Sequence, residues 1–333
     1  MRPPRTVDAV PVQLSPRLGR YALHVVLVAA GYYAGALVGL LQALVNDQVT
    51  PLWPPTGVAV LALLLGGLKM WPGIALGAFA ANSTLSDLGA TVLITAGNTI
   101  GPVVAYLLLR RAGFQPAMDR TRDALALVLL GGLVGMAVSA TIGAGTLLVT
   151  GVIDGGLFWS TWTVWWTGDA LGVLVFVPIV LAFRSFRVRG HTARRWAEAA
   201  ALVVSTAVVM AVASTHDLRL MYLVFPFLIW AALRFQHLGT APCALIASTL
   251  AARGAARSTG PFADLDLPVR MVTLQAFNGT AVLTALLLSA VISERNAARE
   301  AIERTVTQLA SVVARHQPLV LGDLLPPKRR EER

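Results

Sequence analysis

The dominant pattern along this chain is a series of long apolar stretches separated by short polar or basic segments. A lipid bilayer accepts such stretches as helices, because each helix satisfies its own backbone hydrogen bonds. The pattern predicts an all-α, polytopic integral membrane bundle of about eight to ten transmembrane or re-entrant helices. The expected helices cover residues 21–45, 51–68, 71–86, 90–109, 124–150, 157–183, 198–214, 219–234, 239–252 and 270–292.

Several of these stretches are shorter than the ~20 residues that a helix perpendicular to the membrane needs. Three of them contain or adjoin helix-breaking residues, namely Pro54-Pro55, Gly66-Gly67 and Pro72. The sequence leaves open whether they are short crossings, half-helices or re-entrant elements.

Composition supports the membrane interpretation. Hydrophobic residues make up 56% of the chain, charged residues 13%, and the mean hydropathy is +0.68. Cys243 is the sole cysteine, so an intramolecular disulfide is excluded, and its apolar surroundings indicate a packing role. The apolar run from Tyr21 to Val45 is too long for a signal peptide, which favours a retained first helix.

The net charge of +10 is carried almost wholly by arginine. It predicts contacts with anionic membrane lipids on cytoplasmic loops, and no nucleic acid binding, since no basic soluble module exists. Basic residues gather in four places: the N-terminus, residues 110–122, residues 184–195 and the tail from Arg295. Four, two and four expected helices lie between them, so the positive-inside rule places both termini in the cytoplasm. Arg253 and Arg257 lie in an outward loop and are the exception.

We therefore expect four regions: a basic cytoplasmic N-terminus (1–20), an integral membrane domain (21–293), a short signalling helix (294–317) and a disordered charged tail (318–333). In the third region, apolar residues alternate at spacings of four and three, as in a coiled-coil seam. Such a seam would pair two copies into a homodimer, whereas the alternative is an amphipathic helix lying on the membrane. The seam residues are Ile302, Val306, Leu309 and Val313.

The segment from Trp159 to Gly172 contains an aspartate deep within an expected helix. An ionised Asp169 near the bilayer midplane is costly, so it must face the bundle or a wet cavity and have a partner. Helical spacing places Asp169 on one face with Trp159, Trp162 and Trp166. A ligand site and a hydrogen bond that holds the bundle together are both open readings of Asp169.

Other polar residues at similar depth could line one pocket with Asp169. These are Asn82, Asn98, Gln275 and Asn278, and the alternative for each of them is an interhelical hydrogen bond. Arg234 is either a cytoplasmic anchor or, if its segment is re-entrant, a partner of Asp169. Trp53 opens a Trp-Pro-Pro-Thr-Gly turn that starts a helix, whose free amides could also face an anion. The predicted ligand-binding set is Asp169, Trp162, Trp166, Asn82, Asn98, Trp53 and Arg234.

Catalytic signatures are missing from the sequence. It contains no phosphate-binding glycine loop, no zinc-ligand spacing and no obvious carboxylate pair, and its five histidines lie near helix ends or in loops. We therefore expect a protein that is not an enzyme and that needs no metal or cofactor.

Several motifs in order along residues 20–295 resemble those of a bacterial sensor family. The chain is similar to the first-type membrane-associated sensor domain (MASE). The similar segments are Trp53–Gly57, Trp71–Asn82, Gly97-Asn98, Ser139–Gly143, Trp165–Gly172 with Pro178, Phe225–Phe235, Gly260–Phe262, Leu274-Gln275 and Ser293–Arg295.

The resemblance implies a sensory domain of about eight spans in the bacterial plasma (inner) membrane, which normally precedes a cytoplasmic cyclase, phosphodiesterase, histidine kinase or phosphatase. Only about forty residues follow the last expected span, so we expect either that the signal passes to a partner kinase, cyclase or phosphatase or that the chain is a truncated or split sensor. The main alternative is a secondary transporter or permease with a midplane Asp169 site. An intramembrane transferase acting on lipid is a third alternative, which would need charged pairs that the sequence largely lacks.

Overall fold

The computed structural model describes residues 16–41, 50–84, 87–184, 192–216 and 220–316. Within these ranges the chain is built of helices and has no strands, which confirms the all-α polytopic bundle. The helices are α1 (Pro16–Leu40), α2 (Pro54–Gly66), α3 (Trp71–Asn82), α4 (Leu88–Arg111), α5 (Thr121–Ala126), α6 (Gly135–Val149), α7 (Phe158–Arg184), α8 (Ala193–Thr215), α9 (Val224–Phe235), α10 (His237–Ala256) and α11 (Leu267–His316).

Short irregular turns connect or interrupt some of these helices. A π-helical segment (Leu127–Val134) joins α5 to α6, so the two form one continuous body. Single 3₁₀ turns cover Leu68–Met70, Gly155–Leu157, Met221–Leu223 and Gly260–Phe262. With α5 and α6 counted together, each of the ten expected apolar stretches overlaps one helix of the described chain.

Six of the described helical bodies are long and apolar enough to cross a membrane: α1, α4, α5–α6, α7, α8 and α11. Helices α2 and α3 have 13 and 12 residues and are about 18–20 Å long, less than the ~30 Å hydrocarbon core. Neither helix is therefore long enough to cross the hydrocarbon core by itself.

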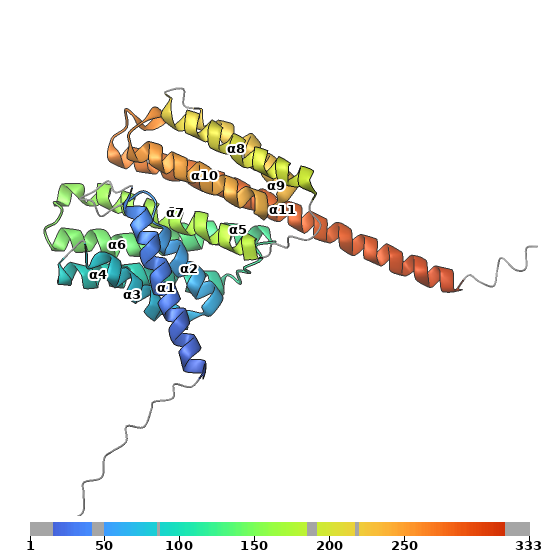
Figure 1. Cartoon of the computed structure of the whole chain (residues 1–333), viewed down its shortest axis with the longest axis horizontal. Coiled ribbons are helices and arrows are strands. Elements are labelled where there is room, and N and C mark those ends of the chain that lie inside the picture. Colours follow the sequence, from blue (N-terminus) through green and yellow to red (C-terminus); the bar gives the residue numbers. More distant parts are fainter. Residues whose placement is uncertain (1–15, 42–49, 85–86, 185–191, 217–219, 317–333) are drawn as a thin grey trace, which may run out of the picture.

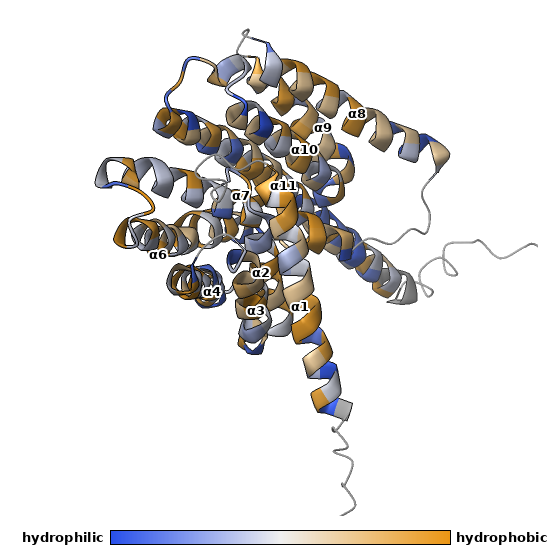
Figure 2. Ribbon diagram, turned by 60° about the vertical axis from the view of Figure 1, so that its left-hand side comes forward, coloured by the Kyte–Doolittle hydropathy of each residue, from blue (hydrophilic) through white to orange (hydrophobic). Residues whose placement is uncertain are grey.

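Helix α7 forms the centre of the bundle. It packs against α2, α6, α10 and α11, and 72% of its apolar window is buried, against 22–44% for the other five spans. Helices α8 to α11 form a layer over α7, and α1 to α6 lie on its other side (Figure 1). Large apolar side chains on α1 and α8, such as Leu27 and Val208, are more than half exposed, as expected of a lipid-facing surface. Figure 2 shows that both helices are hydrophobic over most of their length.

Helix α11 differs from the expected division after residue 293. It is one unbroken helix of 50 residues, because residues 293–316 are mainly strong helix formers and include neither glycine nor proline. Its first half packs against α7, α9 and α10, and its second half projects from the bundle (Figure 1). The expected tail (318–333) and most of the basic N-terminus lie outside the described residues.

Candidate functional site

Asp169 lies in the middle of α7, about 17 Å of helix from Phe158 and about 22 Å from Arg184. Its side chain is buried, with 1% of its surface exposed. The Thr56 hydroxyl of α2 donates a hydrogen bond to Asp169 Oδ1 at 2.5 Å. Asp169 Oδ2 has no hydrogen-bond partner among the described residues, and none of their ion pairs includes Asp169. One carboxylate oxygen is therefore held by the protein and the other is available.

The start of α2 is held against α7 by backbone contacts. The Trp53 N–H donates to the Gly168 carbonyl at 3.0 Å, and Pro54 and Pro55 occupy the first turn, where a missing N–H costs no helical hydrogen bond. A Cβ at Gly172 would collide with the Trp53 carbonyl oxygen, and one at Gly168 with that of Thr50. Small residues four apart thus let the two backbones touch, and this contact places Thr56 on Asp169.

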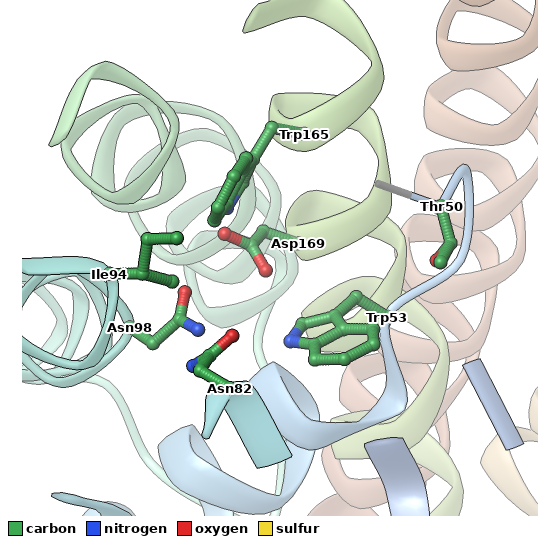
Figure 3. A pocket seen from close by; sticks show the side chains of 7 residues that line it. All are labelled: Thr50, Trp53, Asn82, Ile94, Asn98, Trp165 and Asp169. Carbon is green, nitrogen blue, oxygen red and sulfur yellow. The ribbon is translucent and has the colours of Figure 1, made fainter. Parts of the chain in front are cut away.

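A small cavity adjoins Asp169 at the point where α2 begins and α3 ends (Figure 3). Trp53 immediately precedes α2, and Asn82 is the last residue of α3. The cavity has a volume of about 20 Å³, enough for one water-sized particle. Its lining consists of Thr50, Trp53, Asn82, Ile94, Asn98, Trp165 and Asp169.

Both asparagines of the predicted site reach this cavity and are buried. The side-chain nitrogen of Asn82 donates to the Ala78 carbonyl at 2.8 Å, and Figure 3 shows the Asn82 oxygen directed towards Asp169. The Ser139 hydroxyl of α6 donates to Asn98 Oδ1 at 3.3 Å. The structure therefore brings together four of the predicted residues, from α3, α4, α7 and the turn before α2.

Trp162 and Trp166 do not line the cavity. Their rings stack on each other with centroids 5.5 Å apart, and Trp159 meets Trp162 edge-on. The Trp162 indole N–H donates to the Thr141 hydroxyl at 3.0 Å, and that of Trp166 donates to the Leu133 carbonyl in the π-helical segment at 2.9 Å. These tryptophans therefore connect α7 to the α5–α6 body and form no part of the cavity wall.

Arg234 is also placed elsewhere. Its guanidinium forms an ion pair with Glu198 of α8 at 2.8 Å, and Trp230 donates to the same carboxylate at 3.3 Å. The Arg234–Asp169 pair that the sequence left open is not formed. Arg234 instead connects α9 to α8.

Three lining residues, Thr50, Ile94 and Trp165, and the partner Thr56 were not among the predicted site residues. Trp165 could have been found, because it precedes Asp169 by four residues and so shares its helix face. Thr50 and Ile94 carry no local signal, since only the packing of their elements brings them to the cavity. Gln275 and Asn278 are buried in α11 and lie outside the lining.

A second polar cluster surrounds α11 where it leaves the bundle. Glu294 accepts hydrogen bonds from the Thr121 N–H at 3.0 Å and from the Thr121 hydroxyl at 3.5 Å. Ser293 donates to the Gln236 side chain at 3.4 Å, in the turn between α9 and α10. Nearby, Arg120 and Asp123 form an ion pair at 2.8 Å, and this hydrogen-bonded partner raises the pKa of Arg120. The exit of α11 is thus attached to α5 and to the α9–α10 turn.

Comparison with known protein families shows to which family this chain is related. The model of the MASE1 family matches residues 24–296, which include every helix from α1 to α10 and the membrane half of α11, apart from the first residues of α1. This chain belongs to the MASE1 family. The resemblance noted in the sequence is confirmed, and the protein is a membrane sensory domain of the MASE1 type.

Among curated proteins, the MASE1 chain matches the probable diguanylate cyclase DgcE of Escherichia coli (strain K12). The two are 26% identical over 235 residues, which cover 65% of this chain and 20% of that protein. The chain therefore spans about a fifth of this relative. No solved structure matches the chain.

Proposed function

We propose that this MASE1 domain is a non-enzymatic sensor of the bacterial plasma (inner) membrane, in which occupancy of the Asp169 cavity controls the position of α11. The observation that carries the proposal is the buried Asp169 Oδ2, which faces a cavity built from four separate elements and has no partner among the described residues. Binding there changes contacts between α7 and both short helices. A ligand that prefers one arrangement of these helices shifts the population of the bundle.

A route from the cavity to α11 runs along α7. Leu174 and Pro178 lie about one and a half and two and a half turns after Asp169, and they line a cavity of about 10 Å³ together with Val282 and Leu286 of α11. Pro178 lacks the N–H of a regular helix, which makes α7 easier to bend at this level. A small displacement of α7 would therefore be transmitted to α11, whose exit is held by Glu294 and Thr121.

The activity named for the relative DgcE supports a particular class of cytoplasmic partner for this chain. DgcE is described as a probable diguanylate cyclase, so a cytoplasmic diguanylate cyclase is the favoured output module, and a kinase or phosphatase would be reached in the same way. The projecting half of α11 would carry the signal to it. The arginine-rich end of the bundle, with Arg120, Arg195 and Arg295, would face the cytoplasm.

The direct test is a chimera of residues 1–316 with a diguanylate cyclase domain of known basal activity, produced in bacterial membranes. Asp169→Asn should shift the yield of cyclic dinucleotide severalfold, because it removes the buried charge but preserves the shape of the side chain. Asp154→Asn is the matched control, since Asp154 is exposed in the loop before α7. Equal output from all three chimeras at equal membrane levels would refute the assignment of the cavity.

The transporter alternative shares the Asp169 site and makes a different prediction. Proteoliposomes with a transporter would accumulate a labelled solute, and Asp169→Asn would abolish the uptake. The sensor proposal predicts no accumulation, and only the cyclase chimera should respond.

A further inference from the structure

The size and polarity of the Asp169 cavity restrict what can occupy it. This step rests on the proposed function, because it concerns the same site. A volume of about 20 Å³ holds one particle of the size of a water molecule, so the arrangement described excludes sugars, amino acids and nucleotides. Any occupant of this arrangement must be a water molecule or a small ion.

Charge balance favours a cation over water. The lining contains one carboxylate, Asp169, which is 1% exposed and forms no ion pair with the described residues. Thr56 contributes a neutral hydrogen bond to Asp169 Oδ1, and no cationic side chain of the described residues balances the negative charge. A buried charge without a counterion costs several kcal/mol. A single positive charge beside Asp169 Oδ2 would remove this cost.

The surrounding groups are those that bind cations. Asn82 directs its side-chain oxygen towards Asp169, since its nitrogen is engaged by the Ala78 carbonyl (Figure 3). Asn98 Oδ1 has a second lone pair besides the one used by Ser139. Carboxylate and amide oxygens are the ligands that hard cations prefer. The indoles of Trp53 and Trp165 border the cavity and can add cation–π attraction.

We infer that the Asp169 cavity of this MASE1 domain binds one monovalent cation of about the size of a water molecule, either a metal ion such as Na⁺ or K⁺ or an ammonium ion. The cation bridges Asp169 on α7, Asn98 on α4 and Asn82 on α3, and so fixes α3 and α4 against α7. Loss of the cation would release α3 and α4 from this position. The cation is then the stimulus itself or the ion on which the response depends.

Thermal unfolding of the purified full-length chain in detergent tests this inference. Melting curves are recorded in the chlorides of Na⁺, K⁺, NH₄⁺ and tetramethylammonium at equal ionic strength. A bound cation should raise the melting temperature in proportion to the logarithm of its concentration above the dissociation constant. We expect this rise with at least one small cation and none with tetramethylammonium. The comparison among the small cations distinguishes a metal ion from ammonium.

The variants assign the effect to the cavity. Asp169→Asn should abolish the cation dependence, and Asp154→Asn should retain it. If Asp169→Asn fails to fold, Asn98→Asp provides the second test, because a second carboxylate should transfer the response from monovalent to divalent cations. Equal melting temperatures in all four salts, or a cation dependence that survives Asp169→Asn, would overturn the inference. So would a protein whose stability rises only on acidification, since Asp169 would then be neutralised by a proton.

The outcomes separate this inference from the proposed function. If Asp169→Asn changes the output of the chimera but the melting temperature does not depend on the cation, the proposed sensor site is supported and the proposed cation is ruled out. If the melting temperature depends on the cation but Asp169→Asn leaves the output of the chimera unchanged, the ion has a structural role and the proposed sensor site is contradicted.

Discussion

Glu294 on α11 accepts a hydrogen bond from the backbone N–H of Thr121, the first residue of α5, at 3.0 Å. The two residues are 173 positions apart in the chain. The first N–H groups of a helix have no partner within the helix, so a carboxylate from another helix can act as a cap. Here the cap fixes the point at which α11 leaves the bundle.

We predict that Glu294→Ala disconnects α11 from α5 without unfolding the bundle. A hydrogen bond of this kind contributes roughly 0.5–1.5 kcal/mol, so the balance between two arrangements of α11 should shift about two- to tenfold. The cyclase chimera measures this as altered basal output with a reduced response to Asp169→Asn. Glu294→Gln keeps an acceptor oxygen and should retain most of the coupling. Wild-type behaviour of Glu294→Ala would show that the contact does not carry the signal.

The contact between α2 and α7 yields a second prediction. Gly172→Ala should lower the free energy of unfolding by about 1–3 kcal/mol, because its Cβ would strike the Trp53 carbonyl in a packed interface. Denaturant titration of the purified chain measures the effect. Gly145→Ala is the control, because no atom lies within 4 Å of a Cβ at that position of α6. That control should be neutral or stabilise by up to about 1 kcal/mol.

Substitutions of the neighbouring residues Trp165 and Trp166 should affect stability and sensing differently. Trp166→Phe removes the hydrogen bond to the Leu133 carbonyl and should cost about 1 kcal/mol, with the response of the chimera retained. Trp165→Phe changes the wall of the cavity and should alter the response more than the stability. Thermal unfolding and the chimera assay, applied to both variants, measure the two effects. The reverse pattern would place the site on the Trp162–Trp166 side of α7.

The exposed stripe on α11 gives a test of the predicted homodimer. Ile302, Val306 and Leu309 are 58–63% exposed on the projecting half of the helix. In a Cys243→Ala background, Val306→Cys should form an intermolecular disulfide in membranes, because seam positions face each other in a parallel coiled coil. Ser311→Cys lies on the opposite side of the helix and should cross-link much less. Weak and equal cross-linking at both positions would favour a helix lying on the membrane.

The sequence was sufficient to predict the helices, since each apolar stretch with a length near 20 residues can form one helix in lipid. It also indicated Asp169, Asn82 and Asn98, because polar groups within apolar helices need partners, and Trp53, because it opens the turn before α2; all four line the cavity. It misplaced Trp162, Trp166 and Arg234 with respect to the site. The tryptophans share a face with Asp169 by periodicity alone, but their long side chains reach the α5–α6 body instead. Arg234 pairs with Glu198 on α8, and no local sequence pattern predicts this contact between two helices.

The most direct test of the central claim measures the position of α11 while the Asp169 site is altered. Spin labels at Arg111→Cys on α4 and Thr307→Cys on α11, in a Cys243→Ala background diluted with unlabelled chain, report their distance distribution by double electron–electron resonance. If the Asp169 cavity controls α11, Asp169→Asn shifts this distribution and Asp154→Asn leaves it unchanged. Superimposable distributions for all three folded proteins would contradict the claim that the Asp169 cavity controls α11.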